Sequence, residues 1–207
     1  LQTLQDRVSL AAALVHEGEE REDYQTVDLG QPHLAKPSWT THGRPEHRAG
    51  GPDARLGTHI RFRRYRADAK VLAAVALDPP DLGPGVEEIA EALDNPCRPL
   101  FLGRKNCLPA DRLVFGLCLG VPDLTDAISQ ARRDFPDRWA AAFGAPAITE
   151  VTAEWPITAE DDPLRSRSET HRVVDRRDWR NQLHGGERVV GRGALPLHDA
   201  EPPGGPA

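Results

Sequence analysis

A glycine-arginine loop holds the side chains of this chain best suited to binding a ligand. The loop Gly103–Cys107 follows at once on the short apolar run Leu100–Leu102. Its glycine lets a backbone approach a ligand closely, and the Arg104 guanidinium and Lys105 ammonium suit phosphate groups. Asn106 can both donate and accept hydrogen bonds, as contact with an unpaired base requires. Taken alone, the segment fits a solvated surface turn better than it fits a phosphate site.

A second candidate segment interleaves arginines with aromatic residues on a predicted strand. Arg61, Arg63 and Tyr65 would share one face of that strand. Phe62 and Arg64 would share the other face. Cations alternating with aromatic rings suit a clamp on a nucleic-acid backbone with base stacking. The alternative is a Phe62 that faces the core, with solvated arginines opposite.

The distribution of charge matters more than its total. The net charge is -6 at pH 7. However, residues 42–70 contain eight arginines and lysines against three acidic residues, and residues 165–192 contain eight arginines against four. An acidic protein with two basic regions suits local binding of a polyanion, and solvated loop charges are the alternative. Trp155 and Trp179, near the second region, are explained more simply by a small core than by a partner surface.

No motif for metal or cofactor chemistry is present. The three cysteines lack Cys-x-x-Cys spacing, and His42 and His47 do not have the spacing of a helical zinc site. The glycine motifs of nucleotide sites and nucleophile elbows are absent. We therefore expect no metal and no cofactor. A metal-independent ribonuclease could still be assembled from His59 with Arg63 or Tyr65, because such a site needs a base beside a cation.

The compartment is predicted from the same composition. No apolar run approaches the roughly 20 residues that a membrane helix needs. The odd number of cysteines does not indicate a disulfide framework. We expect a cytoplasmic protein with no membrane partner.

The order of predicted elements indicates an α+β fold of the ferredoxin-like, RNA-recognition type. A strand at Val8–Leu14 is expected to turn at Glu17–Glu19 into Arg21–Val27, the returning strand of a hairpin. A long basic excursion rich in Gly and Pro, residues 28–57, then leads into RFRRYRADA and a strand at Val71–Leu77.

Two amphipathic helices and several short strands are expected in the remainder. The helices are predicted at Val86–Leu93 and at Leu124–Ala131, the second stopped by Pro136. Short strands are expected at Leu100–Leu102, Leu113–Leu119, Ile148–Val151, His171–Asp175 and Glu187–Leu197.

These elements suggest a division of the chain. We expect a core over residues 1–147 with residues 28–57 inserted, a β-rich C-terminal part over residues 148–198, and a disordered tail at residues 199–207. A complete ferredoxin-like domain also needs a first strand and a first helix, which would lie before Leu1.

Three blocks of sequence resemble one family. They are DYQTV (residues 23–27), RFRRYRADAKVLAAVAL (61–77) and RPLFLGRKNCLPADRLVFG (98–116). Their order and spacing are similar to those of the Cas-five (CasD) subunits of the type I-E CRISPR Cascade complex, members of the RAMP superfamily. The resemblance extends from Leu4 and fades after about Arg165.

This resemblance implies a non-catalytic RNA-binding subunit of a CRISPR surveillance ribonucleoprotein complex in antiviral defence. Residues 28–57 would form a thumb that crosses the guide, and Gly103–Cys107 would bind the 5′ handle of the CRISPR RNA (crRNA). The implied partners are the crRNA, the backbone subunit that the chain caps, the large PAM-reading subunit, other Cascade subunits and, indirectly, target DNA. An endoribonuclease that processes CRISPR repeat RNA is the alternative. The residues expected at RNA are Tyr24, Arg44, Arg48, His59, Arg61, Arg63, Tyr65, Gly103, Arg104, Lys105, Asn106 and Cys107.

Overall fold

The protein is described here from a computed structural model. The structure describes residues 2–28, 38–39, 45–46, 58–103, 107–118, 120–144, 148–158, 165–178, 180–181 and 183–198. The chain divides into two compact units, one formed by Leu1–His16 with Lys70–Ala207 and the other by Glu17–Ala69.

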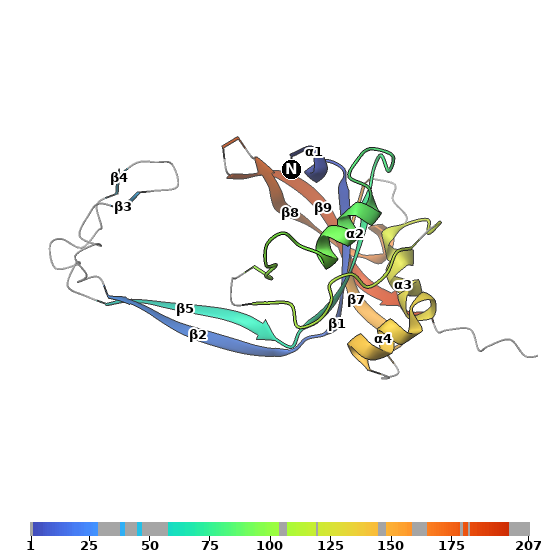
Figure 1. The fold of residues 1–207 in the computed structure, drawn as a ribbon, viewed down its shortest axis with the longest axis horizontal. Helices are drawn as coiled ribbons and strands as arrows, with labels where there is room; N and C mark the ends of the chain where they lie inside the picture. The colour runs from blue at the N-terminus through green and yellow to red at the C-terminus, as the bar shows by residue number, and fades with distance from the viewer. Residues whose placement is uncertain are drawn as a thin grey trace, which may run out of the picture. The chain divides into compact units, whose positions relative to one another are not determined.

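A five-stranded antiparallel sheet forms the first unit, in the order β6-β1-β7-β9-β8 (Figure 1). Its strands are β1 (Val8–His16), β6 (Lys70–Leu77), β7 (Glu150–Pro156), β8 (Glu169–Asp178) and β9 (Leu183–Pro196). Alternation along β1 and β7 buries one face, because Ala11, Ala13 and Trp155 lie in the core. The burial of Trp155 confirms that it covers a core.

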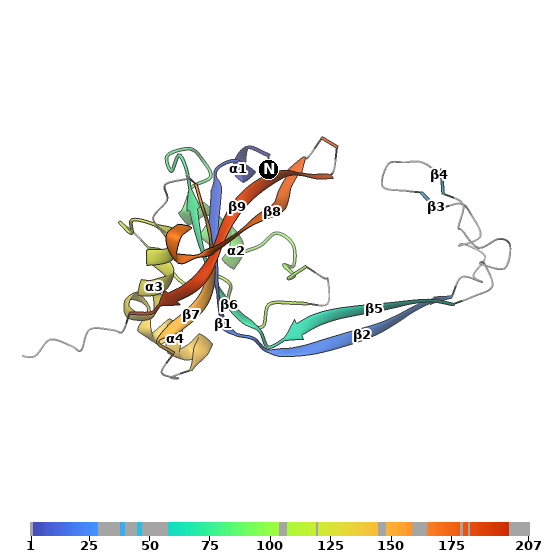
Figure 2. The ribbon, with the colours of Figure 1, turned by 180° about the vertical axis from the view of Figure 1, so that it is seen from behind.

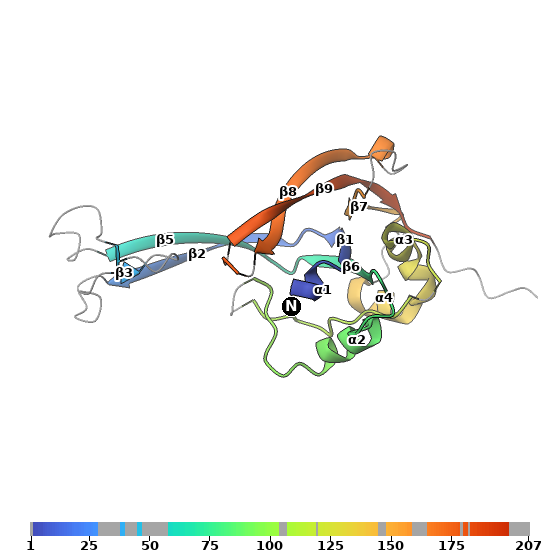
Figure 3. The ribbon, with the colours of Figure 1, turned by 90° about the horizontal axis from the view of Figure 1, so that it is seen from above.

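Two of the helices, α3 and α4, cover that buried face. The helices are α1 (Gln2–Gln5), α2 (Val86–Asp94), α3 (Leu124–Asp134) and α4 (Pro136–Phe143), with a short 3-10 turn at Arg165–Arg167. Figures 2 and 3 show α3 and α4 beside β7 and β9. Ile128 of α3 and Trp139 of α4 belong to the same core cluster as the sheet residues. No helix in the described part of the chain is long and apolar enough to cross a membrane.

The second unit is a long two-stranded hairpin inserted between β1 and β6. Strands β2 (Glu19–Asp28) and β5 (Thr58–Ala67) pair antiparallel along their whole length. A two-residue pairing of β3 (Ser38–Trp39) with β4 (Pro45–Glu46) is also described. The rest of the predicted excursion, residues 28–57, lies outside the described residues.

The α+β class with an inserted hairpin is confirmed, but one predicted pairing is wrong. Val8–Leu14 does not form a hairpin with Arg21–Val27, because β1 pairs with β6 and β7 while β2 pairs with β5. Gly18, just before β2, has φ 68. A β-carbon there would lie 2.2 Å from the Ala67 carbonyl oxygen, so only glycine fits.

Two predicted strands are absent from the described residues. Leu100–Leu102 is irregular, and the side chains of Phe101 and Leu102 are exposed. Residues 113–118 are also irregular. Side chains hold this second segment: Phe115 packs against Trp139, and an Arg138 guanidinium nitrogen donates a 2.9 Å hydrogen bond to the carbonyl of residue 114.

Most other predicted elements are confirmed. α2, α3, β6, β8 and β9 lie where the sequence pattern placed them, whereas β7 begins two residues later and ends five residues later than the predicted strand Ile148–Val151. α4 was not predicted, because Pro136 begins this helix as well as ending the one before it. Since β7, β8 and β9 complete the sheet that contains β1 and β6, the sheet crosses residue 147; the boundary expected there stays a prediction.

Candidate nucleic-acid interface

The β2–β5 hairpin presents one face rich in arginine. Arg61 lies opposite Gln25, Arg63 opposite Asp23 and Tyr65 opposite Arg21. Because side chains alternate along a strand, these three β5 residues share a face, as predicted. We call this the arginine face.

Two arginines of this face are available to a ligand. Arg61 and Arg63 are exposed, and no ion pair engages either within the described residues. Arg21 is different, because one of its guanidinium nitrogens lies 2.5 Å from a Glu19 carboxylate oxygen. Free guanidinium groups spaced two residues apart on a strand suit successive phosphates.

The opposite face of the hairpin carries exposed aromatic rings. Tyr24 and Phe62 are 60% and 62% exposed, and their ring centroids lie 5.5 Å apart in an edge-to-face contact. Ile60 is also exposed on this face. We call these three residues the aromatic patch.

The cations on the aromatic side are already paired. The Arg64 Nε lies 3.0 Å from a Glu22 carboxylate oxygen and 3.8 Å from one of Glu20. The hydrogen bond to Glu22 and the charge of Glu20 raise the pKa of the Arg64 guanidinium. Arg66 contacts the carboxylate of Glu17 at 3.4 Å. These pairs leave the arginine face as the more positive side of the hairpin.

Phe62 was missed as a candidate binding residue. The sequence interpretation allowed a core-facing Phe62, and its exposure excludes that placement. A signal was present: Arg64 and Arg66 have the same parity as Phe62, and charged residues at alternate positions argue against a buried face. Tyr24 packs within the hairpin, as expected, yet most of its surface remains open.

Several predicted residues are described only in part. The backbone of His59 pairs with that of Val27, and its side chain lies outside the described part of the structure. Arg44 and Arg48 also lie outside the described residues. The base-and-cation arrangement of a ribonuclease therefore stays a prediction.

The glycine loop belongs to the first unit and is closed by a backbone hydrogen bond. The amide of Leu102 donates to the carbonyl of Cys107 over 2.7 Å. Gly103 has φ 76, a conformation that side-chain-bearing residues rarely adopt. Among the residues that the structure describes, none has a heavy atom within 4 Å of the position where a β-carbon on Gly103 would be. Arg104, Lys105 and Asn106 lie outside the described residues.

A surface pocket of about 410 Å³ lies between α2 and residues 112–117. Glu87, Glu91 and Asp94 contribute carboxylates to its lining. Arg112 lines it as well, but its Nε donates to Asp94 over 2.6 Å, and this bond lowers the pKa of the Asp94 carboxyl. The pocket is therefore acidic and poorly suited to a polyanion. Among the residues described, no three metal-ligating side chains gather as a metal site would require.

Comparison with known proteins gives one family and one fold. A model of the CRISPR-associated protein (Cas_Cas5) family matches residues 1–191. A chain of a solved CRISPR RNA-guided surveillance complex shares the fold with a TM-score of 0.54 at 20% sequence identity, over 92% of this chain and 68% of that chain. No curated protein matches.

Proposed function

Because the chain belongs to the CRISPR-associated protein Cas5 family, we propose that it is a non-catalytic, RNA-binding subunit of a CRISPR surveillance complex. In this proposal the complex is a type I-E Cascade. The chain binds the 5′ handle of the crRNA, caps the row of backbone subunits and contacts the large subunit that reads the PAM.

The observation that carries the proposal is the arginine face of the β2–β5 hairpin. Arg61 and Arg63 are exposed and lack carboxylate partners in the described part of the chain, whereas Arg64 and Arg66 are paired. A clamp on single-stranded RNA needs such unpaired cations near aromatic side chains, and Tyr65 lies on the same face. The turn that contains Gly103 would add phosphate contacts through Arg104 and Lys105.

A filter-binding titration with handle RNA tests the proposal. The double substitution Arg61→Ala/Arg63→Ala should weaken binding by about 3–6 kcal/mol, because each arginine supplies a charged hydrogen bond worth about 1.5–3 kcal/mol. The slope of log affinity against log salt should fall by about 1.4, or about 0.7 for each lost phosphate contact. Arg64→Ala/Arg66→Ala, which removes the same charge from the paired side, is the matched control and should change binding much less.

The same reactions distinguish binding from cleavage. We expect the recovered RNA to be intact with and without EDTA, since a binding subunit needs neither a metal nor a general base. Site-specific cleavage that disappears in His59→Ala would instead support an endoribonuclease. Equal binding by the two double variants would remove the arginine face from the proposed site.

A further inference from the structure

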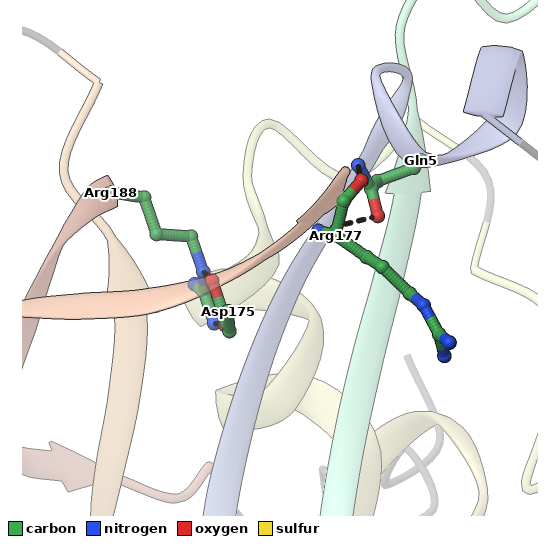
Figure 4. A network of polar contacts seen from close by, with 4 residues as sticks. All are labelled: Gln5, Asp175, Arg177 and Arg188. Carbon is green, nitrogen blue, oxygen red and sulfur yellow. Dashed lines mark hydrogen bonds and ion pairs between the residues drawn. The ribbon is translucent and has the colours of Figure 1, made fainter. Parts of the chain in front are cut away.

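A second group of arginines lies at the turn end of the β8–β9 hairpin. Residues 176–186 contain Arg176, Arg177 and Arg180 against one acidic residue, Asp178. In the strands that lead to this turn, residues 169–175 and 187–196, acidic side chains and arginines are equal in number. Arg188 binds the Asp175 carboxylate through Nε at 2.8 and 2.9 Å and through Nη2 at 2.5 Å (Figure 4).

The one carboxylate at the turn is occupied by the turn itself. Asp178 accepts hydrogen bonds from the backbone amides of Arg180 and Asn181 at 2.9 and 3.0 Å, and from the Asn181 side chain at 2.7 Å. The bond from the Asn181 side chain is the main cause of the lowered pKa of Asp178. Arg176 and Arg180 are exposed, and within the described residues no ion pair engages their side chains.

The structure also fixes this end of the hairpin in place. The Gln5 side chain donates to the carbonyl of Arg177 and accepts from its amide, both over 3.1 Å, so that it occupies the strand edge as a partner strand would (Figure 4). The aliphatic part of Arg176 lies across Gly186, where an added β-carbon would be 2.5 Å from the Arg176 Cβ. Less conformational entropy is then lost when the guanidinium groups bind.

We propose that this hairpin end, defined by the exposed Arg176 and Arg180 and called the arginine turn, binds the phosphodiester backbone of a nucleic acid. The surface offers planar cationic donors, which match phosphate oxygens. The proposal adds a contact surface beyond the β2–β5 hairpin and the glycine loop. This proposal depends on the proposed function in one respect, which is that the complex contains a nucleic acid.

A salt titration with the full chain tests the arginine turn. Arg176→Gln/Arg180→Gln is compared with Arg172→Gln/Arg192→Gln, a matched control with the same change of charge. The control arginines already face carboxylates, Arg172 that of Glu187 at 3.2 Å and Arg192 that of Glu154 at 4.0 Å. Fluorescence anisotropy is measured from about 50 to about 200 mM salt. The probes are labelled single-stranded repeat RNA and a DNA duplex of equal length.

Loss of the two arginines should weaken binding of one probe about tenfold at the lower salt concentration. The salt slope should fall by about 1.4 if the ligand is single-stranded RNA, or by about 1.8 if it is duplex DNA. The probe that shows the change identifies the nucleic acid. The control variant should keep the slope of the unmodified chain for both probes.

Two results would overturn the proposal. One is an unchanged slope for both probes in a variant whose circular dichroism and melting match the unmodified chain. The other is normal nucleic-acid binding with loss of co-purifying subunits, which would identify the arginine turn as a protein contact. Neither result affects the proposed function, because that depends on handle binding through Arg61 and Arg63, measured with a separate variant.

Discussion

Arg7 shows how a single charged residue can organise a fold although no carboxylate among the described residues pairs with it. It is 9% exposed, and its guanidinium donates to the carbonyl groups of Pro79 at 2.8 Å and Gly83 at 3.1 Å, and also to that of Leu82. The backbone amide of Asp78 returns a 3.0 Å bond to the Arg7 carbonyl. One side chain therefore fixes the connection between β6 and α2 through the backbone alone.

This arrangement predicts a large loss of stability on truncation. Arg7→Ala should lower the free energy of unfolding by about 2–4 kcal/mol, because the carbonyl groups of Pro79, Leu82 and Gly83 lose their charged donor. Arg7→Lys keeps the charge but loses the planar guanidinium group. It should also lower the free energy of unfolding, but by less than Arg7→Ala. Urea unfolding measures both.

Arg98→Ala is the control for Arg7→Ala. Arg98 is exposed, and its substitution removes the same charge from the chain. It should change stability by less than about 0.5 kcal/mol. If Arg7→Ala proved as mild as this control, the carbonyl contacts would not be what holds the connection.

At the scale of elements, structure set by residues close together in the sequence could be predicted, whereas pairing between distant segments could not. α3 was predictable because Leu124, Ile128 and Ala131 repeat at helical spacing. The pairing of β1 with β6 was not, because it joins segments separated by the whole inserted hairpin. Apolar runs as short as Leu100–Leu102 do not distinguish a strand from a segment held by its side chains.

The candidate site follows the same rule. The faces of β5 followed from alternation, whereas the exposure of Phe62 depends on which residues lie across from it. The sequence also could not show that Arg61 is unpaired. In sequence, Glu22 is about as far from Arg61 as from Arg64, although within the described residues it pairs only with Arg64. Pairing register decides which arginines are neutralised.

The cap of α3 allows an element-level prediction. The Asp123 carboxylate accepts from the backbone amides of Thr125 at 2.7 Å and Asp126 at 2.8 Å. Asp123→Ala should therefore cost about 1 kcal/mol of stability at neutral pH. Asp123→Asn should cost little there, because asparagine caps helices about as well. Thermal unfolding of both variants provides the comparison.

The pH dependence of that cap follows from the sign of its shift. Burial raises the pKa of Asp123, but hydrogen bonds from Thr125 and Asp126 outweigh it and hold the pKa below its ordinary value. The cap's contribution is thus fully present above the unfolded pKa of about 3.9 and is lost as pH falls through the folded pKa. Asp123→Asn lacks this titration, so its stability relative to the unmodified chain should improve in acid. A constant difference across that range would contradict the assignment.

For the whole molecule, the two units differ in how they can be stabilised. The first unit has a shared core in which Ala11 and Ala13 are fully buried and Trp155 is 3% exposed. In the second unit, none of the described side chains of β2 and β5 is buried. A two-stranded hairpin without a core is marginally stable in water. The hairpin that carries the arginine face is therefore expected to gain order from a ligand.

Hydrogen exchange tests this expectation directly. Without RNA, backbone amides of β2 and β5 should exchange at least about 100-fold faster than those of β7, because only the core strands open near the global unfolding free energy. Handle RNA should slow exchange in β2 and β5 and leave β7 unchanged. In Arg61→Ala/Arg63→Ala the RNA should give no such protection, whereas Arg64→Ala/Arg66→Ala should retain it. If β2 and β5 were as protected as β7 before RNA is added, the hairpin would be rigid by itself and its order would not depend on binding.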